Sequence, residues 1–98
     1  MRIVVPVKVQ DGLDSVVSLI DEASGFAFLD LGEGMSVETL SFKNSFENEL
    51  FDYIIVCDKN EELEEAFDLG ARALLARPGM NLDEIVEALM FRELDEIL

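Results

Sequence analysis

The sequence predicts one α/β domain that spans residues 1–98 and is built on a mixed five-stranded sheet. Three observations predict it. Apolar residues alternate along residues 2–9, as in a strand with one buried face. Residues 53–57 are apolar without interruption, which is typical of a strand buried on both faces of a parallel sheet. Residues 81–97 carry apolar side chains at helical spacing, and a chain of 98 residues has room for a single core.

The first half of the chain contains three of the expected strands. Residues 2–9 form the first strand. Residues 14–22 fit either a short helix or a loop packed on the core. Residues 26–31 and residues 35–43 are two further strands, and the glycine-containing segment between them favours a tight turn, so that they form a hairpin.

The second half alternates strands with helices. Residues 45–51 are expected to form a short helix, followed by the strand at residues 53–57. Either Asp58 or Asn60 is expected to cap the next helix, and Asp58 with Glu61 has the spacing of a capping box. Residues 71–76 form the fifth strand.

Both later helices show a buried side and a boundary signal. The first is expected to end at Gly70 and to bury Leu63, Ala66 and Phe67. Asn81 and Glu84 repeat the capping-box spacing at the last helix. The apolar stripe of that helix is expected to run to the C-terminus and to consist of Ile85, Val86, Leu89, Met90, Leu94 and Ile97.

The charge of the chain restricts its partners. There are 22 acidic residues against 7 basic ones, a formal net charge of −15. Such a surface repels nucleic-acid phosphates, anionic membranes and anionic metal clusters, and it favours a basic protein partner or a divalent cation. Histidine is absent and Cys57 is the one cysteine, which excludes a disulfide within the chain and the usual Ser/His/Asp and Cys/His catalytic sets. No leader sequence is apparent, and we expect a cytoplasmic protein without enzymatic activity.

Three carboxylates form the strongest candidate metal site. Asp11 and Asp58 each follow a strand, and Asp14 is close in sequence to Asp11. If the strands at residues 2–9 and 53–57 are parallel neighbours, these side chains lie at the carboxyl ends of adjacent strands, where open α/β sheets bind ligands. Carboxylates there could hold Mg²⁺ or Mn²⁺ and support phosphoryl transfer. The alternative is that Asp11 is a turn residue and Asp58 a helix cap.

Other residues allow both a functional and a structural interpretation. Cys57 is either a ligand for a soft metal or a small buried apolar residue. The acidic residues at positions 61–65 either bind a basic partner or are present because the helix dipole stabilises negative charge in the first turn. Met80, Met90 and Phe91 form either an exposed apolar patch or part of the core.

Several segments resemble, in their order and spacing, the dinitrogenase iron–molybdenum cofactor biosynthesis family, which includes the NifX-like carriers and the C-terminal domain of NifB. The resemblance rests on the opening residues 1–7, on the Ala-x-x-Phe-x-x-x-Asp pattern at residues 23–30, and on Leu-Gly-Ala-Arg-Ala at residues 69–73. It covers nearly the whole chain. It implies a ribonuclease H-like, three-layer α/β/α fold and a non-enzymatic carrier or accessory role.

The sequence departs from the family where the cofactor should bind. The His-Phe-Gly of the family corresponds here to Leu19, Ile20 and Asp21, and its glycine-rich loop after the central strand is replaced by residues 58–62. Of the cofactor-binding positions, only Cys57 offers a soft ligand, since cluster binding needs thiolate or imidazole groups. We therefore expect an accessory or interaction domain with weakened or lost cluster binding and a basic protein partner, and the sequence does not identify a cofactor.

Overall fold

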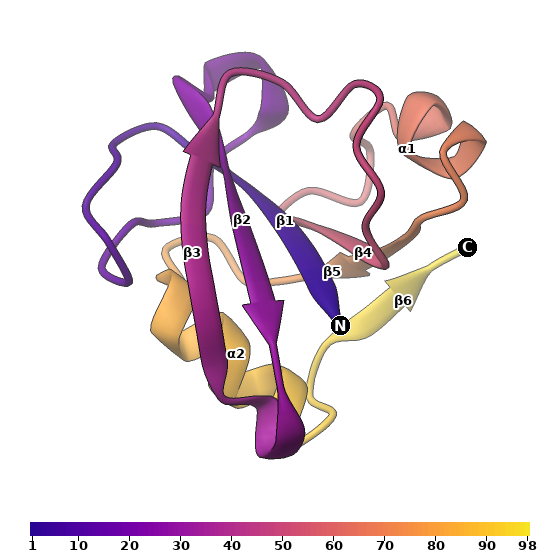
Figure 1. The fold of residues 1–98 in the computed structure, drawn as a ribbon. Coiled ribbons are helices and arrows are strands. Elements are labelled where there is room, and N and C mark those ends of the chain that lie inside the picture. Colours follow the sequence, from indigo (N-terminus) through magenta and orange to yellow (C-terminus); the bar gives the residue numbers. More distant parts are fainter.

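A six-stranded mixed sheet forms the centre of the computed structural model, which describes residues 1–98 (Figure 1). The strands are β1 (Arg2–Val7), β2 (Gly25–Leu31), β3 (Val37–Lys43), β4 (Tyr53–Val56), β5 (Arg72–Leu75) and β6 (Asp95–Ile97). The helices are α1 (Glu64–Asp68) and α2 (Leu82–Met90), and two 3-10 turns, η1 (Ile20–Glu22) and η2 (Glu33–Met35), precede β2 and β3. Neither helix has the length and apolar character needed to cross a membrane.

The strand order β3-β2-β1-β4-β5-β6 confirms the expected α/β class and hairpin. β1 pairs antiparallel with β2 on one side and parallel with β4 on the other, in the register Ile3 to Tyr53 and Val4 to Ile54. The expectation that the first and fourth strands are parallel neighbours is therefore confirmed. β4 and β5 are also parallel and are connected through α1, while β6 closes the sheet antiparallel to β5.

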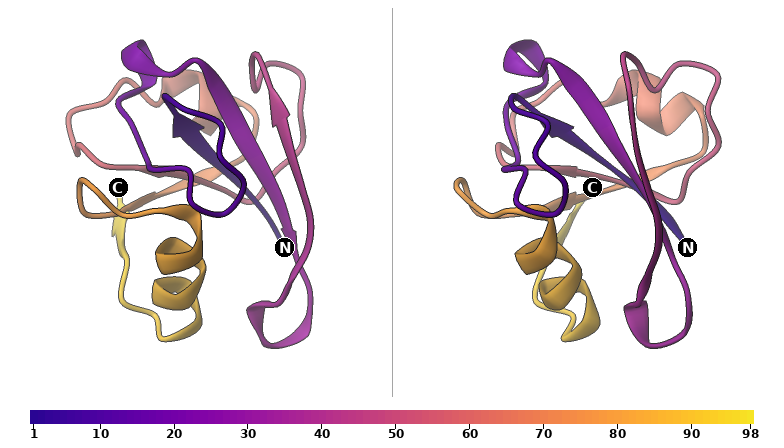
Figure 2. Two further views of the ribbon diagram at one scale, coloured as in Figure 1. Left: turned by 90° about the vertical axis from the view of Figure 1, so that its left-hand side faces the viewer. Right: turned by 60° about the vertical axis from the view of Figure 1, so that its left-hand side comes forward.

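Alternate residues of the strands divide the core between the two faces of the sheet. Ile3, Val5 and Val7 of β1 face a cluster of 15 buried residues that includes Leu82 and Ile85 of α2. Val4 faces a second cluster of 10 buried residues that also contains residues of α1 and of the loop before β4. α1 and α2 thus lie on opposite faces, as the two further views of the ribbon show (Figure 2).

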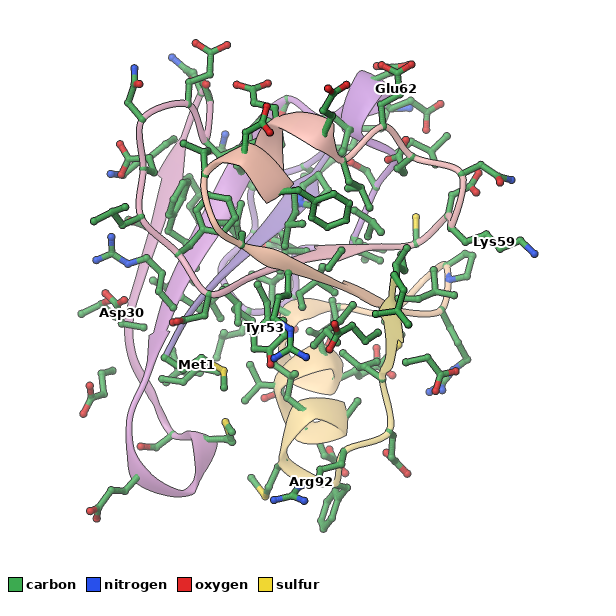
Figure 3. The ribbon with its side chains drawn as sticks, turned by 90° about the vertical axis from the view of Figure 1, so that its right-hand side faces the viewer. Met1, Asp30, Tyr53, Lys59, Glu62 and Arg92 are labelled. Carbon is green, nitrogen blue, oxygen red and sulfur yellow. The ribbon has the colours of Figure 1, made fainter.

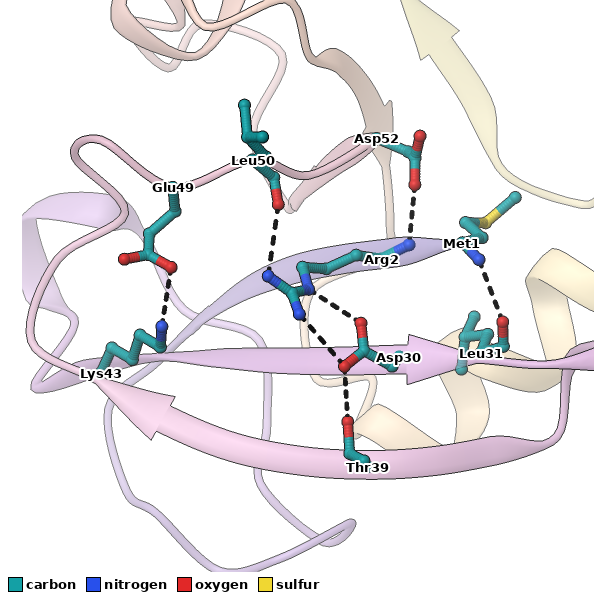
Figure 4. A network of polar contacts seen from close by, with 9 residues as sticks. All are labelled: Met1, Arg2, Asp30, Leu31, Thr39, Lys43, Glu49, Leu50 and Asp52. Atoms are coloured by element: carbon teal, nitrogen blue, oxygen red, sulfur yellow. Dashed lines mark hydrogen bonds and ion pairs between the residues drawn. The ribbon is translucent and has the colours of Figure 1, made fainter.

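A polar network fastens the amino end of β1 to the hairpin (Figure 4). The Nε of Arg2 donates a hydrogen bond of 2.8 Å to the Oδ1 of Asp30, and the Thr39 hydroxyl donates one of 2.7 Å to the Oδ2 of the same carboxylate. The Arg2 guanidinium, with the Thr39 hydroxyl, lowers the pKa of Asp30 to about 2. The backbone N–H of Arg2 also donates to Asp52, just before β4, so the network joins β1, β2 and β3 and extends to the start of β4.

The short helix expected at residues 45–51 does not form. This segment is an irregular loop, in which Phe46 and Phe51 both turn toward the sheet. Their rings pack edge to face with a centroid separation of 5.9 Å, and Phe51 packs in the same way against Phe28. Two aromatic residues five positions apart cannot both point to one side of a helix. The free energy gained by burying both rings outweighs the local helix propensity of the segment.

The capping box predicted at Asp58 is also wrong. α1 begins only at Glu64, and its N-cap residue, Leu63, provides no side-chain cap. The Asp58 carboxylate accepts a hydrogen bond from the Asn60 N–H, and Glu61 accepts one from Ile20 instead of closing a capping box. The helix is consequently short, and Phe67, predicted to be buried, is 43% exposed.

The last helix stops earlier than its apolar pattern predicted. Its capping box is present as expected, since Asn81 accepts from the Glu84 N–H at 2.8 Å and Glu84 accepts from the Asn81 N–H. After Met90, however, Arg92 takes a positive φ of 56°, which ends the helix, and residues 95–97 become β6. The sheet therefore has six strands rather than five, and Met90 lies on the surface rather than in the core.

Candidate functional site

The largest pocket lies at the carboxyl ends of β1 and β4 and has a volume of about 700 Å³. Lys8 and Val9, directly after β1, form one side, and Cys57 and Asp58, directly after β4, form another. Within the sheet, β2 lies beside one edge of β1 and β4 lies beside the other, so the strand order changes direction at β1. This is the change of direction at which open α/β sheets bind ligands. The remaining lining residues are Asp11, Asp14, Ser15, Val16, Val17, Ser18, Leu19, Glu22 and Pro78.

The segment between β1 and η1 forms the wall of this pocket, and hydrogen bonds hold it against the sheet. The Ser18 N–H donates to the Pro6 carbonyl and the Val17 N–H to the Met80 carbonyl, both at 2.9 Å. Ser15 is 1% exposed, and its hydroxyl accepts from the Asp11 N–H and donates to the Gly12 carbonyl, each at 2.7 Å. The wall is thus an ordered loop with its own internal turn. Of the two interpretations of residues 14–22, the packed loop holds for residues 14–19, and the short helical turn holds for residues 20–22, which form η1.

The first turn of α2 completes the attachment of the wall. The N–H groups at the start of a helix have no partner inside the helix and need one elsewhere. Here the Leu82 N–H donates to the Ser15 carbonyl at 2.9 Å and the Asp83 N–H to the Leu13 carbonyl at 3.2 Å. The pocket wall and α2 therefore stabilise each other.

The side chains around the pocket are mostly negative. Asp11, Asp14, Glu22 and Asp58 contribute carboxylates, and Lys8 contributes one ammonium group. Lys59 follows Asp58 but points away from the body of the protein into solvent (Figure 3). The pocket consequently attracts cations, in keeping with the charge of the whole chain.

Cys57 also lies in this pocket, in a setting that favours its neutral thiol. Its thiol is partly buried and also lines a second, smaller pocket with Arg77. Burial raises the pKa of the Cys57 thiol, and the nearby carboxylates of Glu61 and Asp58 raise it further. Both effects favour the neutral thiol over the thiolate, which is the reactive form of a cysteine nucleophile.

The structure brings some of the residues singled out from the sequence together and separates others. Asp11, Asp14 and Asp58 share the main pocket with Leu19 and Cys57. No group of three acidic, cysteine or histidine side chains is arranged to hold a metal ion.

Two of the positions at which the resemblance places the cofactor lie elsewhere. Ile20 and Asp21 line a separate small pocket with Glu61. Ile20 also packs against the core on the α1 face, and its N–H donates to Glu61 at 2.7 Å. Of the three residues that correspond to His-Phe-Gly, only Leu19, at the edge of η1, lines the main pocket.

The sequence interpretation missed most of the apolar lining. Val9, Val16 and Pro78 all face the pocket. Val9 had been assigned to the first strand, but β1 ends at Val7 and leaves Val9 67% exposed. The one sequence signal for this apolar lining was the valines close to the acidic residues. Their exposure can be recognised only when the end of β1 is known.

Comparisons with known proteins agree on the fold. No family model and no curated protein matches the chain. Among solved structures, the chain is similar to PH0822, with a TM-score of 0.78 and 15% identity over 98% of this chain and 96% of that chain. It is also similar to MJ0327 of Methanocaldococcus jannaschii, described as a candidate dinitrogenase, with a TM-score of 0.74 and 17% identity over 99% and 94% of the two chains.

A third similar structure is TM1290 of Thermotoga, described as a candidate NifB protein of the DUF35 family. Its TM-score is 0.72 at 21% identity, over 97% of this chain and 91% of that chain. At these identities the likeness concerns the fold. The chain therefore shares its fold, over nearly its whole length, with proteins named for dinitrogenase and for NifB.

Proposed function

We propose that this chain is a non-enzymatic accessory domain of the iron–molybdenum cofactor carrier type, in which the pocket binds a basic protein partner instead of a metal cluster. The observation that carries the proposal is the chemistry of the pocket at the ends of β1 and β4, where four carboxylates line the same pocket as a cysteine whose thiol pKa is raised. Anionic clusters need thiolate or imidazole ligands and a positive surrounding, and neither is provided by these residues. The three-layer, ribonuclease H-like architecture implied by the resemblance belongs to the same proposal.

The shared fold supports an accessory role. The similarity to MJ0327 and TM1290 extends over at least 97% of this chain, so it concerns the whole sheet and both helices. Loss of the ligand positions on an otherwise retained fold is what we expect of a domain that kept its interactions and gave up its cargo.

Metal content is the direct test. We expect protein purified without oxygen, from a host that makes iron–sulfur clusters, to be colourless and free of stoichiometric iron by mass spectrometry. Cys57→Ser should leave both results unchanged. Stoichiometric iron with broad visible absorption that is lost in Cys57→Ser would overturn the proposal and restore the carrier role.

A divalent-cation site is the second candidate, because Asp11, Asp14 and Asp58 line one pocket. A cation that binds only the folded protein raises its melting temperature. If the site exists, about 10 mM Mn²⁺, roughly ten times a Kd of about 1 mM, raises the melting temperature of the protein, and Asp58→Asn removes that increment. Glu47→Gln is the matched control, since it removes one exposed charge from the loop before β4. An equal increment in both variants would mean general charge screening, and hydrolysis of a phosphate ester with Mn²⁺ would test the associated phosphoryl transfer.

A further inference from the structure

We infer that the pocket at the ends of β1 and β4 receives a lysine or arginine side chain from a partner protein, presented on a linear segment with apolar residues on either side of it. The inference rests on the proposed function and gives its partner a chemical class and a docking place. It is carried by three features of the pocket: unpaired carboxylates, an apolar wall, and an ordered frame.

The carboxylates of the pocket have no positive partner within the protein. The three ion pairs of the structure join Arg2 to Asp30, Lys43 to Glu49, and Arg72 to Glu96. None of them involves the pocket, and Asp58 accepts one hydrogen bond, from the backbone of Asn60. Four negative charges against Lys8 leave an excess that a guanidinium or ammonium group of a partner would neutralise.

The wall of the pocket adds an apolar component. Val9 and Val16 are 67% and 44% exposed and stand beside these carboxylates, with Leu19 and Pro78 also lining the pocket. Lysine and arginine carry aliphatic stems that pack on such surfaces while their charged ends reach polar groups. The exposed valines extend the apolar surface outward, where neighbouring apolar side chains of the same segment would cover them.

The shape of the site favours a side chain over a bare cation. About 700 Å³ is far more than one ion occupies, and no three ligand side chains converge on a point. The wall is fixed before binding, because Ser15 and the start of α2 hold residues 11–18 in place. A preformed site of this kind binds without the cost of ordering a loop.

The experiment follows the backbone amide signals of the ¹⁵N-labelled protein by NMR at about 150 mM salt, where long-range attraction is screened. The probe is a capped peptide, Leu-Lys-Leu-Arg-Leu. Two matched peptides separate the contributions: Leu-Gln-Leu-Gln-Leu lacks the charges, and Gly-Lys-Gly-Arg-Gly lacks the apolar neighbours. Spermidine serves as a small cation without a peptide chain.

We expect the first peptide to shift the amides of Val9, Ser18 and Asp58 saturably, and each of the three comparison ligands to bind at least about 5-fold more weakly, which corresponds to losing one favourable contact. Asp14→Asn and Val16→Ser should each lower the affinity for the first peptide by about 5-fold, because each removes one favourable contact. Glu47→Gln, which removes an identical charge outside the pocket, should leave its affinity unchanged.

Shifts spread over the whole acidic surface, or an equal loss in Glu47→Gln, would overturn the inference in favour of general electrostatic attraction. Equal affinity for spermidine would overturn it in favour of a small-cation site. These outcomes are distinguishable from failure of the proposed function, which is decided by iron in the purified protein. An iron-free protein that does not bind the peptide contradicts the docking inference and leaves the proposed loss of cluster binding standing.

Discussion

The two faces of the sheet are closed in different ways. On one face, α2 has nine residues, a complete capping box and a regular apolar stripe that reaches a cluster of 15 buried residues. On the other face, α1 has five residues and no side-chain cap, and much of the cover comes from an irregular loop anchored by Phe46 and Phe51. A regular helix and a few aromatic anchors can thus exclude water equally well, but only the helix leaves a periodic pattern in the sequence.

The largest expected effect comes from the α2 face. Ile85 is fully buried between α2 and the sheet. We expect Ile85→Ala to lower the free energy of unfolding by about 4 kcal/mol, because it removes buried methyl groups and leaves a cavity. Urea denaturation followed by circular dichroism measures the change. The matched truncation on the other helix, Phe67→Ala, should cost less than about 1 kcal/mol, since Phe67 is largely on the surface.

The second prediction tests whether the loop on the α1 face is a true structural cover. Phe51 packs against both Phe28 and Phe46, at centroid distances of 6.4 Å and 5.9 Å. We expect Phe51→Ala to cost about 3 kcal/mol, slightly less than Ile85→Ala because a loop can partly collapse into the space. Leu50→Ala is the control, because that neighbouring side chain is 79% exposed and should have almost no effect. Equal losses of unfolding free energy in Phe51→Ala and Leu50→Ala would contradict the anchoring role of Phe51.

This contrast explains which parts of the fold could be predicted from the sequence. Five of the six strands were predictable, from alternating apolar residues as in β1 or from an uninterrupted apolar run as in β4. α2 was predictable from its helical apolar spacing, and its capping box from Asn81 and Glu84 alone. The helix predicted at residues 45–51 is a loop, because the two buried phenylalanines of this segment are positioned by contacts with the sheet and not by helical spacing. β6 was missed because Leu94 and Ile97 continue the helical spacing of α2, while the left-handed turn at Arg92 separates them from it.

The candidate site was predictable in its position but not in its composition. The parallel pairing of β1 and β4 places Asp11 and Asp58 at the same edge of the sheet, as the order of elements indicated. The apolar half of the pocket could not be foreseen, since it depends on where β1 ends and on how residues 11–18 fold back onto the sheet. Backbone hydrogen bonds to Pro6, Met80 and α2 determine that path, and they leave no mark in the residue types.

A smaller effect should separate the two helices at their starts. Asn81 accepts the Glu84 N–H at 2.8 Å, so Asn81→Ala leaves a helix donor without its partner. We expect a loss of about 1 kcal/mol in the free energy of unfolding. The control is Asn60→Ala before α1, where no side chain caps the helix and no change is expected. A similar loss in both variants would show that α1 depends on a cap that the hydrogen bonds do not reveal.

The smallest effect concerns the polar network that joins β1, β2 and β3 at the end of the sheet away from the pocket. The Arg2 guanidinium, aided by Thr39, lowers the pKa of Asp30 to about 2, whereas an unfolded aspartate titrates near about 4. A folded-state pKa below the unfolded one means that the pair stabilises the protein above about pH 4 and loses this contribution as the pH falls toward 2. Both side chains are more than a third exposed, so solvent screening limits the effect to less than about 1 kcal/mol.

Asp30→Asn isolates this contribution. The variant should be slightly less stable than the original protein at pH 5, and the difference should shrink between about pH 4 and pH 2 as the original carboxylate is protonated. Melting temperatures measured across that range test it, with Asp95→Asn as a control for the loss of one exposed charge. A constant difference at every pH would mean that Asp30 acts through its packing and its hydrogen bond with Thr39. In that case the charge of Arg2 would contribute nothing to holding the hairpin against β1.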